Sequence, residues 1–372
     1  MMIAFKIAAL LFLLIYIGYL VYGAIGFKKT NYFVLDESQI NKTKTCIIIC
    51  ARNEEQNIEK CLRSIINQNF DFSLLEVIIV NDGSTDNTLS LSQKTMEDFK
   101  GAYQILNHKT SLGKKACITS AIGFCDCELI ITKDADTFAE SPYWLKTIVS
   151  YYEQTNKQFI ICPLEIENKS GLLNQLQFFE NNALSIITGG FAFYKKAFLC
   201  NGANLAFTKK LFKKIGGYEK HLHVNSGDDV LFLEEVKEID PETIGYLKNK
   251  NAAIITYPVK GLKKLLAQKV RWASKFDLNP NPINTFLGLI AFLVHVFGLF
   301  YLIKPIFAHH IPIIGIIFIF LRVLIDFLLL FLASRYYSRP VKWLWFVPLA
   351  FFYSFYVIVT ALLSLIIKPK RK

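Results

Sequence analysis

Long apolar segments and shorter apolar runs alternate with polar stretches along this chain. Four of the apolar segments are long, over residues 2–22, 286–303, 311–333 and 343–367. Each has the length that a helix needs to cross a hydrocarbon core of roughly 30 Å. The pattern predicts one amino-terminal membrane anchor, a more polar domain, and about three further spans.

The first apolar segment indicates how the chain is oriented. It contains a single charge, Lys6, and Lys28 and Lys29 follow it. A cleaved signal peptide is the alternative, but the apolar core exceeds the usual length of roughly 7 to 15 residues, and no small-x-small cleavage site is evident. We expect an uncleaved anchor in the cell membrane, with the next domain in the cytoplasm by the positive-inside rule. Three later spans would place the basic residues 368–372 outside, against that rule, so a re-entrant or interfacial segment stays an open alternative.

Between the anchor and the later spans, short apolar runs alternate with helix-like stretches. Residues 45–51 are apolar on both faces, and the runs at 76–80, 103–106 and 128–132 have the length of strands. Strands that alternate with helices imply an α/β domain with a mostly parallel sheet covered on both faces. The helix after the first strand has one apolar stripe. Asn53 is expected to cap it, with the following two glutamates in its first turn.

Polar residues follow several of these strands, among them Asn53, Asp82, Asp134 and Asp136. Each has a structural explanation when taken alone, because Asn and Asp are common caps and turn residues. Ligands of parallel sheets bind beyond the carboxyl ends of the strands, so four polar exits on one edge favour a binding site. The pair Asp134 and Asp136 suits Mg²⁺ or Mn²⁺, which take oxygen ligands from carboxylates and substrate phosphates. No dinucleotide-binding or P-loop glycine motif is present, which argues against those enzyme classes.

Composition narrows the class of protein further. With 53% hydrophobic and 19% charged residues, the chain is too apolar for an ordinary soluble protein. The net charge of +12 would suit nucleic acid, but no aromatic-rich basic recognition motif accompanies it. The basic residues cluster at 260–275 and 368–372, beside apolar segments, so we expect membrane lipids and no nucleic acid as partners. The eight cysteines show no paired zinc spacing, and Cys125 and Cys127 are the one close pair. This favours structural thiols in a reducing compartment over a metal or disulfide role.

Four motifs in succession resemble the nucleotide-sugar signatures of glycosyltransferase family 2, which has a GT-A fold. They are Ala-Arg-Asn-Glu-Glu at 51–55, Val-Asn-Asp-Gly-Ser-Thr-Asp at 80–86, Leu-Gly-Lys-Lys at 112–115 and Asp-Ala-Asp at 134–136. The resemblance implies that Asp82 contacts the uracil and ribose side of a UDP-sugar and that Asp136 ligates Mg²⁺ or Mn²⁺ on the diphosphate. It implies further nucleotide-sugar contacts at Ala51, Asn53, Glu54, Lys114 and Asp134.

Two motifs of the second half resemble the acceptor side and the catalytic base of the same family. Cys-Asn-Gly-Ala-Asn-Leu at 200–205 is similar to a loop near the sugar and acceptor, which assigns Asn201 and Gly202 to that side. Ser-Gly-Asp-Asp at 226–229 resembles the Gly-Glu-Asp motif. Position by position, this makes Asp229 the base and Asp228 its acidic neighbour, where the family more often has Glu. The structural alternative is the first turn of a helix, where Asp is common.

A further motif, Gln-x-x-Arg-Trp, places Gln268, Arg271 and Trp272 in an amphipathic stretch at 260–276 that we expect to lie at the membrane surface. It resembles membrane-embedded members such as cellulose, hyaluronan and poly-N-acetylglucosamine synthases and ceramide glucosyltransferases. The resemblance implies that Arg271 helps to hold the diphosphate and that Trp272 stacks on an acceptor sugar or lines the entry of the product. Membrane anchoring alone is the alternative role for the tryptophan.

The expected organisation is an anchor at 1–29, a GT-A domain at 30–259, the interfacial helix at 260–285 and a membrane region at 286–372. In the middle span, Arg322 and Asp326 are expected to pair on one helix face, with a polar passage as the alternative.

The expected activity is inverting transfer from a UDP-sugar to a polysaccharide or lipid-linked acceptor. Transfer of one sugar to a membrane lipid and a silent nucleotide-binding scaffold are the alternatives.

Overall fold

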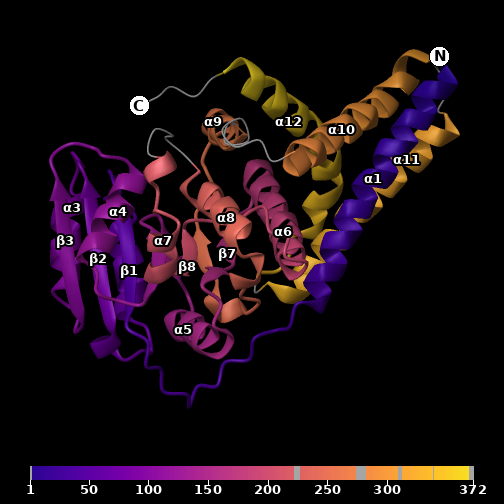
Figure 1. Ribbon diagram of the computed structural model, residues 1–372. Helices are drawn as coiled ribbons and strands as arrows, with labels where there is room; N and C mark the ends of the chain where they lie inside the picture. The colour runs from indigo at the N-terminus through magenta and orange to yellow at the C-terminus, as the bar shows by residue number, and fades with distance from the viewer. Residues whose placement is uncertain (1, 222–226, 274–281, 309–311, 338, 368–372) are drawn as a thin grey trace. The chain divides into compact units, whose positions relative to one another are not determined.

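The computed structural model describes residues 2–221, 227–273, 282–308, 312–337 and 339–367 (Figure 1). The chain divides into two compact units. The sheet unit comprises Lys29–Glu167 and Phe191–Tyr257, and the helical unit comprises Met1–Lys28, Asn168–Gly190 and Pro258–Lys372. The expected boundaries after residues 29, 259 and 285 stay predictions, and residues 168–190 belong with the helical unit.

Within the described residues, seven strands form the main sheet, in the order β3-β2-β1-β4-β8-β6-β9. Neighbours among β1 to β4 are parallel, β8 is antiparallel to both β4 and β6, and β9 is parallel to β6. The strands are β1 (Thr45–Ala51), β2 (Leu75–Asp82), β3 (Ala102–His108), β4 (Leu129–Asp134), β6 (Phe159–Ile161), β8 (Asn204–Thr208) and β9 (Ile244–Tyr246). A smaller sheet has the order β5-β10-β7, with β5 (Thr137–Ala139), β10 (Ile254–Thr256) and β7 (Leu164–Ile166). The expected α/β fold with a mostly parallel sheet is confirmed.

The core of the sheet unit forms around β1, because strands flank it and helices cover it. Ile47, Ile48 and Ile49 are each at most 1% exposed, as the apolar run predicts for a central parallel strand. α2 (Ile58–Ile66) packs its apolar stripe into the core shared with β1 and β2. The other helices are α3 (Thr88–Met96), α4 (Lys114–Phe124), α5 (Trp144–Thr155), α7 (Lys209–Lys214) and α8 (Asp228–Ile239).

The start of α2 differs from the prediction. The helix begins at Ile58 after Asn57, so Asn53 is not its cap, and Glu54 and Glu55 precede its first turn. The backbone N–H groups of Asn57 and Ile58 both donate to the Glu54 carbonyl, which forms a separate turn before the helix. Asn53 has φ +58° in the left-handed region that Asn tolerates. The capping prediction is wrong because this turn shifts the helix start four residues onward.

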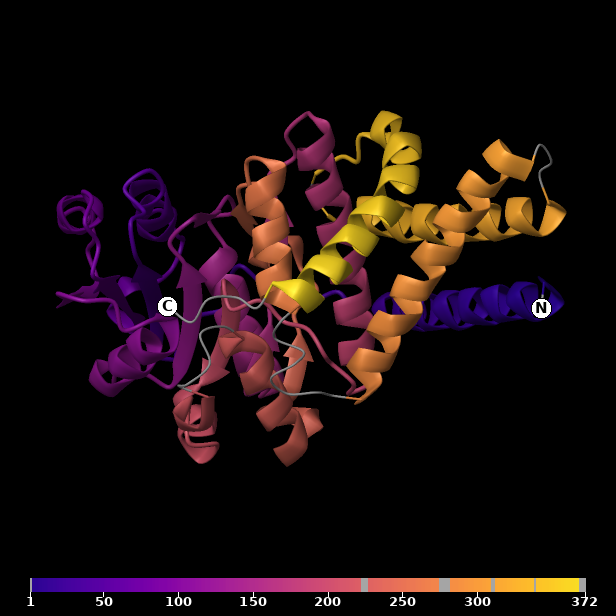
Figure 2. The same cartoon turned by 90° about the horizontal axis from the view of Figure 1, so that it is seen from above.

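Among the described residues, four helices are long and apolar enough to cross a membrane, at the places that the sequence predicts. They are α1 (Met2–Lys29), α10 (Pro282–Ala308), α11 (Ile313–Tyr336) and α12 (Phe346–Ile366). Figure 2 shows α10 crossing α1 and α11, and the ring of Phe297 on α10 lies 5.1 Å from that of Phe5 on α1. The basic tail at 368–372 lies outside the described residues.

Two further helices complete the helical unit, α6 (Leu172–Phe193) and α9 (Leu262–Ala273). α6 crosses α1 at Gly190, where a Cβ atom would lie 1.7 Å from the carbonyl oxygen of Gly23. Small residues permit such close backbone approach between helices in membranes. Apolar side chains of α6, α9, α11 and α12 pack into one cluster of their own.

Polar side chains also link the helices of this unit. The predicted pairing of Arg322 and Asp326 is confirmed, with 3.5 Å between Nη2 and Oδ2. Arg322 also donates to Ser354 Oγ on α12 at 2.8 Å, and His295 Nδ1 lies 3.2 Å from the same oxygen. Because the three long helices α10, α11 and α12 share this contact, the charged pair has a structural role inside the apolar bundle.

Candidate active site

The topology of the sheet brings several predicted site residues to one edge. β1, β2 and β4 run parallel, so their carboxyl ends lie together. β8 runs the opposite way, and its first residue, Asn204, pairs with Lys133 near the end of β4. The loop before β8, which carries Asn201 and Gly202, therefore meets the exits of β1, β2 and β4. All of these segments belong to the sheet unit.

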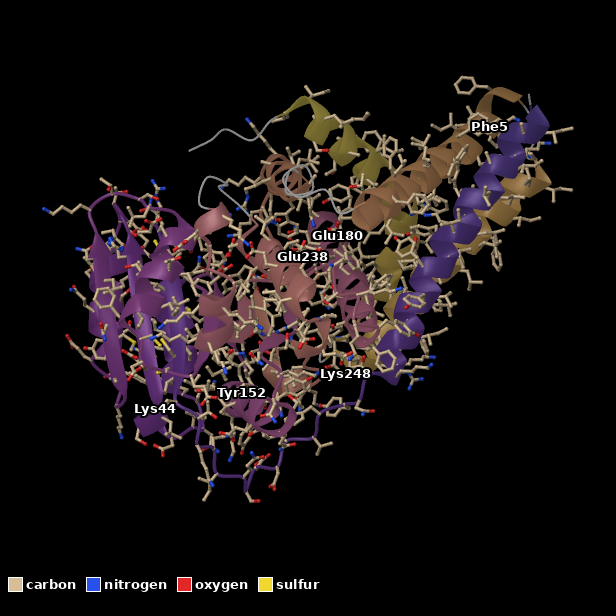
Figure 3. All side chains as sticks on the ribbon, in the orientation of Figure 1. Phe5, Lys44, Tyr152, Glu180, Glu238 and Lys248 are labelled. Atoms are coloured by element: carbon tan, nitrogen blue, oxygen red, sulfur yellow. The ribbon has the colours of Figure 1, made fainter. Side chains whose placement is uncertain are left out.

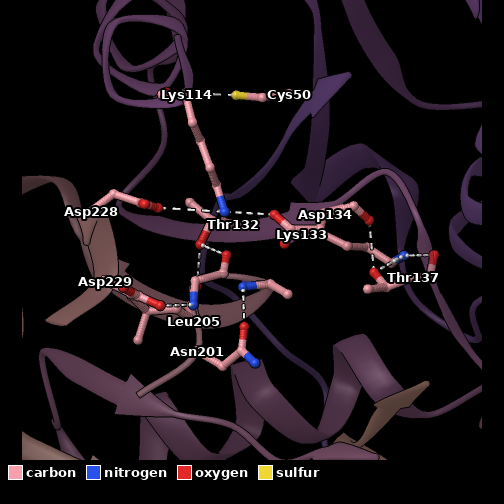
Figure 4. Close-up of polar contacts among 12 residues, drawn as sticks. Cys50, Lys114, Thr132, Lys133, Asp134, Thr137, Asn201, Leu205, Asp228 and Asp229 are labelled. Atoms are coloured by element: carbon pink, nitrogen blue, oxygen red, sulfur yellow. Dashed lines mark hydrogen bonds and ion pairs between the residues drawn. The ribbon is translucent and has the colours of Figure 1, made fainter. Parts of the chain in front are cut away.

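Lys114 connects the two halves of this edge (Figure 4). It is the first residue of α4, and its Nζ lies 2.6 Å from Asp134 Oδ1 at the end of β4 and 3.4 Å from Asp228 Oδ2 at the start of α8. Burial alone would lower the pKa of Lys114, but Asp134 and Asp228 raise it well above its usual range. The site thus holds a permanent positive charge between carboxylates from distant parts of the sequence.

Asp229 lies beside this charge and is oriented by the backbone. Its Oδ2 accepts a hydrogen bond from the Gly202 N–H at 3.2 Å, and its Oδ1 accepts one from the Val230 N–H at 2.8 Å. A Cβ atom at Gly202 would lie 3.1 Å from Asp228 Oδ2 and 3.3 Å from the Lys114 ammonium, so glycine permits the close approach expected here. Asp228 and Asp229 also lie in the first turn of α8, as the structural alternative expects. The two residues can therefore begin the helix and belong to the site at the same time. Ser226 of the motif lies outside the described residues.

Asn201 shapes the loop on which Gly202 lies. Its Oδ1 accepts a hydrogen bond from the Ala203 N–H at 3.0 Å. Thr132 on β4 donates its hydroxyl to the Gly202 carbonyl at 2.8 Å and so ties this loop to the strand that ends in Asp134. Sequence reasoning missed Thr132, because nothing in the apolar run distinguishes it from an ordinary β-branched strand residue.

Carboxylates gather at the end of β4 and the turn after β1. Burial, the charge of Asp134 and then that of Glu54 raise the pKa of Asp136 to about 6. Burial also raises the pKa of Glu54, the hydrogen bond from Asn57 lowers it in part, and Asp134 and Asp86 raise it further. Mutually repelling carboxylates are the hard oxygen ligands that Mg²⁺ and Mn²⁺ prefer, so the residues present fit such a cation.

The shift at Asp136 predicts how stability depends on pH without metal. The pKa of about 6 lies above the ordinary 3.8, so the folded chain binds this proton more tightly than the unfolded chain, and stability falls as pH rises from about 4 to 6. Above that range, Asp136→Asn should melt higher than the wild type in EDTA, by about 2–4 °C per kcal/mol recovered. Thermal unfolding at pH 4 and pH 7.5 tests this, with added Mn²⁺ narrowing the difference. Equal melting temperatures of the wild type and Asp136→Asn at pH 7.5 in EDTA would show that the charge of Asp136 does not destabilise the folded chain.

Lys133 is a second residue that sequence reasoning did not assign. It is 1% exposed, and its Nζ lies 3.0 Å from Thr137 Oγ1 and 3.2 Å from Cys61 Sγ. It also donates to the Thr137 carbonyl, which fixes the turn that carries Asp134 and Asp136. A lysine within an otherwise apolar strand was the available signal, because a buried ammonium needs partners close by.

Asp82, the last residue of β2, holds the loop that leads to Lys114. Its carboxylate accepts hydrogen bonds from the Leu112 N–H at 2.6 Å, the Ser111 hydroxyl at 2.8 Å and the Gly113 N–H at 3.2 Å. Burial opposes the charge, but the bonds from Leu112 and Ser111 keep the pKa of Asp82 below its usual value. The contact of Asp82 with uracil stays a prediction.

The remaining donor-side residues lie at the end of β1. Ala51 is buried and pairs with Asn81 on β2. Asn53 accepts a hydrogen bond at its Oδ1 from the Thr85 N–H at 2.8 Å, which joins the exits of β1 and β2. These residues shape the edge mainly through the backbone, and their contact with a nucleotide sugar stays a prediction.

Gln268, Arg271 and Trp272 lie on α9, in the helical unit. α9 is amphipathic as expected, with Leu265 and Val270 buried and Trp272 38% exposed. The Lys269 ammonium lies 4.3 Å from the centre of the Trp272 ring and also forms an ion pair with Glu180 on α6, which is labelled in Figure 3. The role of this motif at the acceptor stays a prediction.

The fold of the chain is also found in a solved structure. A solved mannosyltransferase from Pyrobaculum calidifontis, in complex with GDP-Man and Mn²⁺, matches with a TM-score of 0.58 and 18% identity, over 97% of this chain and 98% of the other. The fold is therefore the GT-A fold of glycosyltransferases.

The family follows from the sequence of the sheet unit. Residues 46–216 match the family model described as glycosyl transferase family 2. These residues therefore form a glycosyltransferase family 2 domain, as the motifs predicted.

Curated relatives share part of this chain. A poly-beta-1,6-N-acetyl-D-glucosamine synthase from Staphylococcus epidermidis is 24% identical over 200 residues, which is 49% of this chain and 47% of the relative. A 4,4'-diaponeurosporenoate glycosyltransferase from Staphylococcus aureus is 26% identical over 183 residues, which is 45% of this chain and 46% of the relative. The match thus spans about half the length of these relatives.

Proposed function

We propose that this chain transfers a sugar, with inversion, from a UDP-sugar to an acceptor hydroxyl at the cytoplasmic face of the cell membrane. The observation that carries the proposal is the meeting of Lys114, Asp134, Asp228 and Asp229 at one edge of the sheet. The Lys114 ammonium and the clustered carboxylates are the groups that the departure of a diphosphate requires. The separately oriented carboxylate of Asp229 is the group that the activation of a hydroxyl requires.

On the donor side, Asp136 would hold Mg²⁺ or Mn²⁺, assisted by Asp134. When bound, the cation neutralises charge on the diphosphate of the donor. Lys114 keeps its proton because two carboxylates surround it, so it can supply positive charge near the departing UDP. Asp82 keeps the loop before Lys114 in place. Ala51, Asn53 and Glu54 would line the nucleotide-sugar side of the edge.

On the acceptor side, Asp229 would take the proton of the attacking hydroxyl. The oxygen of the acceptor then forms its bond to the anomeric carbon as the bond to the diphosphate breaks, which inverts that carbon. The N–H groups of Gly202 and Val230 orient the Asp229 carboxylate. Asp228 pairs with Lys114 and is thus placed to position that lysine rather than to accept the proton.

The acceptor is proposed to be a polysaccharide or a lipid-linked glycan. One relative is named as a poly-beta-1,6-N-acetyl-D-glucosamine synthase, which makes a polymer, and the other as a 4,4'-diaponeurosporenoate glycosyltransferase, whose name contains no polymer. Transfer of one sugar to a membrane lipid is therefore the second candidate. The four candidate spans among the described residues favour it, because they are few for a wide polysaccharide channel.

The proposal is tested with the full chain in lipid nanodiscs, supplied with Mn²⁺ and a panel of UDP-sugars. Release of UDP together with a labelled product is expected for one of them. Chain length of the product, read by mass spectrometry, separates a polymer from a glycolipid carrying one sugar. GDP-mannose serves as the second arm of the panel. Its exclusive consumption would overturn the UDP assignment, and no transfer from any nucleotide sugar in lipid would contradict the proposed reaction.

Trp272→Ala is predicted to impair transfer while sparing donor binding. The exposed ring on the amphipathic α9 offers a stacking surface for a sugar or lipid, whereas the donor residues lie in the sheet unit. We expect transfer to fall by about 10-fold, in line with stacking worth roughly 0.5–1.5 kcal/mol, with an unchanged Kd for UDP. Trp345→Ala, which removes a ring outside the motif, is the control. Normal transfer by Trp272→Ala would make the residue an interfacial anchor only.

A further inference from the structure

A second group of chemically reactive side chains lies at the edge of the sheet opposite the catalytic residues. Cys46 is the second residue of β1, and it pairs in register with Glu76, the second residue of β2. Cys125 and Cys127 lie in the segment between α4 and β4. Strand β1 separates this group from Ala51 at the catalytic edge by about 16 Å, at roughly 3.3 Å per residue.

The ligand atoms of this group are close together. The two sulfurs of Cys46 and Cys125 and a carboxylate oxygen of Glu76 all lie within 4.8 Å of one another, and no other three ligand atoms of His, Cys, Asp or Glu lie this close together among the described residues. Cys127 Sγ lies 3.7 Å from Glu76 Oε2 and is in hydrogen-bond contact with Cys125. Figure 3 shows sulfur atoms gathered beside the strands of the sheet unit, whose first strand follows the labelled Lys44.

The group differs from ordinary buried thiols because it includes a carboxylate. Cys46 and Cys125 are 0% and 1% exposed, as small apolar residues often are. Glu76, however, directs one carboxylate oxygen at these thiols while its Oε1 accepts a hydrogen bond from Gln104 Nε2 at 3.0 Å. This second contact orients the carboxylate, as outer hydrogen bonds commonly do for metal ligands. A cation bound among the thiols would give this carboxylate a positively charged partner.

We propose that Cys46, Cys125, Cys127 and Glu76 bind one Zn²⁺ ion that joins β1, β2 and the segment before β4. Three thiolates and one carboxylate complete the four-coordinate sphere of a structural zinc site. In tetrahedral geometry, with Zn–S near 2.3 Å, two sulfurs lie about 3.8 Å apart, so the sulfurs of Cys46 and Cys125 need to approach each other by no more than about 1 Å. Thiolates select Zn²⁺ over the Mg²⁺ or Mn²⁺ that suit Asp136.

The surroundings of the group fit a bound anionic zinc complex. Three thiolates, one carboxylate and Zn²⁺ sum to a net charge of −2, and the Lys209 ammonium donates to the carbonyl of Cys125 nearby. Glu76 is only partly buried, which leaves a route for the ion from solvent. The spacing of cysteines in the sequence did not reveal the group, because its members come from three segments that only the parallel sheet brings together. The proposal is independent of the transferase reaction.

The test measures metal content in the full chain, purified in detergent without chelators. Mass spectrometry of metals should find about one zinc per chain in the wild type, as for a closed structural site. Cys125→Ser should lose this zinc, whereas Cys162→Ser, a buried cysteine on the segment after β6, and Asp136→Ala should retain it. Cobalt exchanged into the wild type should show a thiolate charge-transfer band that Cys125→Ser lacks. Glu76→Gln, which keeps the size of the side chain, should lower zinc affinity at least 10-fold and replaces Cys125→Ser if that variant does not fold.

Two results would overturn the proposal. A wild-type chain that holds no zinc and has all eight cysteines titratable after denaturation would show that the group consists of packed thiols only. A chain without zinc and with two fewer titratable thiols, restored by reductant, would identify a disulfide instead. Zinc retained by both Cys125→Ser and Glu76→Gln would place the ion elsewhere and equally contradict the assignment.

Discussion

Asp229→Asn is expected to reduce sugar transfer by roughly 100-fold to 10,000-fold, the usual cost of removing a general base. Asn preserves the size of the side chain and an oxygen that can accept from the Gly202 N–H, but it cannot take a proton from the acceptor. Binding of UDP should change little. Single-turnover transfer and equilibrium UDP titration on the same preparation separate the two effects.

Two control variants on α8 sharpen this prediction. Glu238→Gln neutralises an exposed carboxylate on the same helix and should leave transfer unchanged. Asp228→Asn removes the carboxylate that lies 3.4 Å from the Lys114 ammonium. It should reduce sugar transfer less than Asp229→Asn does, and it should alter the use of the donor. Near-normal turnover in Asp229→Asn, combined with a large loss in Asp228→Asn, would move the base to Asp228.

Asp136→Ala is expected to weaken UDP binding and to make it insensitive to Mn²⁺. A cation on the diphosphate has few protein ligands, and even partners outside the first coordination sphere typically cost 10-fold to 100-fold when lost, so removal of a direct ligand should cost at least as much. Calorimetric titration with UDP in the presence of Mn²⁺ or EDTA gives the measurement.

The control for this variant is Asp98→Ala, which removes a carboxylate from an exposed ion pair with Arg63. Surface pairs contribute little, so its UDP binding should keep its full dependence on metal. If Asp136→Ala retains binding that still responds to Mn²⁺, the cation is held by other groups and the assignment of Asp136 fails.

The parts of the fold that follow from local pattern were predictable from the sequence. The isoleucines of β1 and the span lengths carry their own signal, because period and length alone distinguish a buried strand from a membrane helix. The strands β2 and β4 extend beyond the predicted runs, since Asp82 and Asp134 continue the ladder of hydrogen bonds despite their polarity. The start of α2 was misplaced for a comparable reason, because the turn at Glu54 competes with capping by Asn53.

The contacts of the site depend on pairings that no local pattern encodes. The ion pairs of Lys114 join residues 20 and more than 100 positions apart, which only the folded sheet unit brings together. The sequence likewise contains Lys133 and the cysteines of the opposite edge but does not indicate which residues they contact. Motif order pointed to the residues of the edge, whereas their hydrogen bonds required the fold.

Residues 168–190 belong to the helical unit, and this has a practical consequence for producing the protein. These residues interrupt the sheet unit in the sequence, and α6 buries Leu176, Phe178 and Phe179 against apolar side chains of α9, α11 and α12. A fragment obtained by deleting the flanking spans would keep α6 but expose these three side chains. Together they would form an apolar patch that favours aggregation. Solubilisation of the intact chain in detergent or nanodiscs is therefore the sounder route to an active, monodisperse sample.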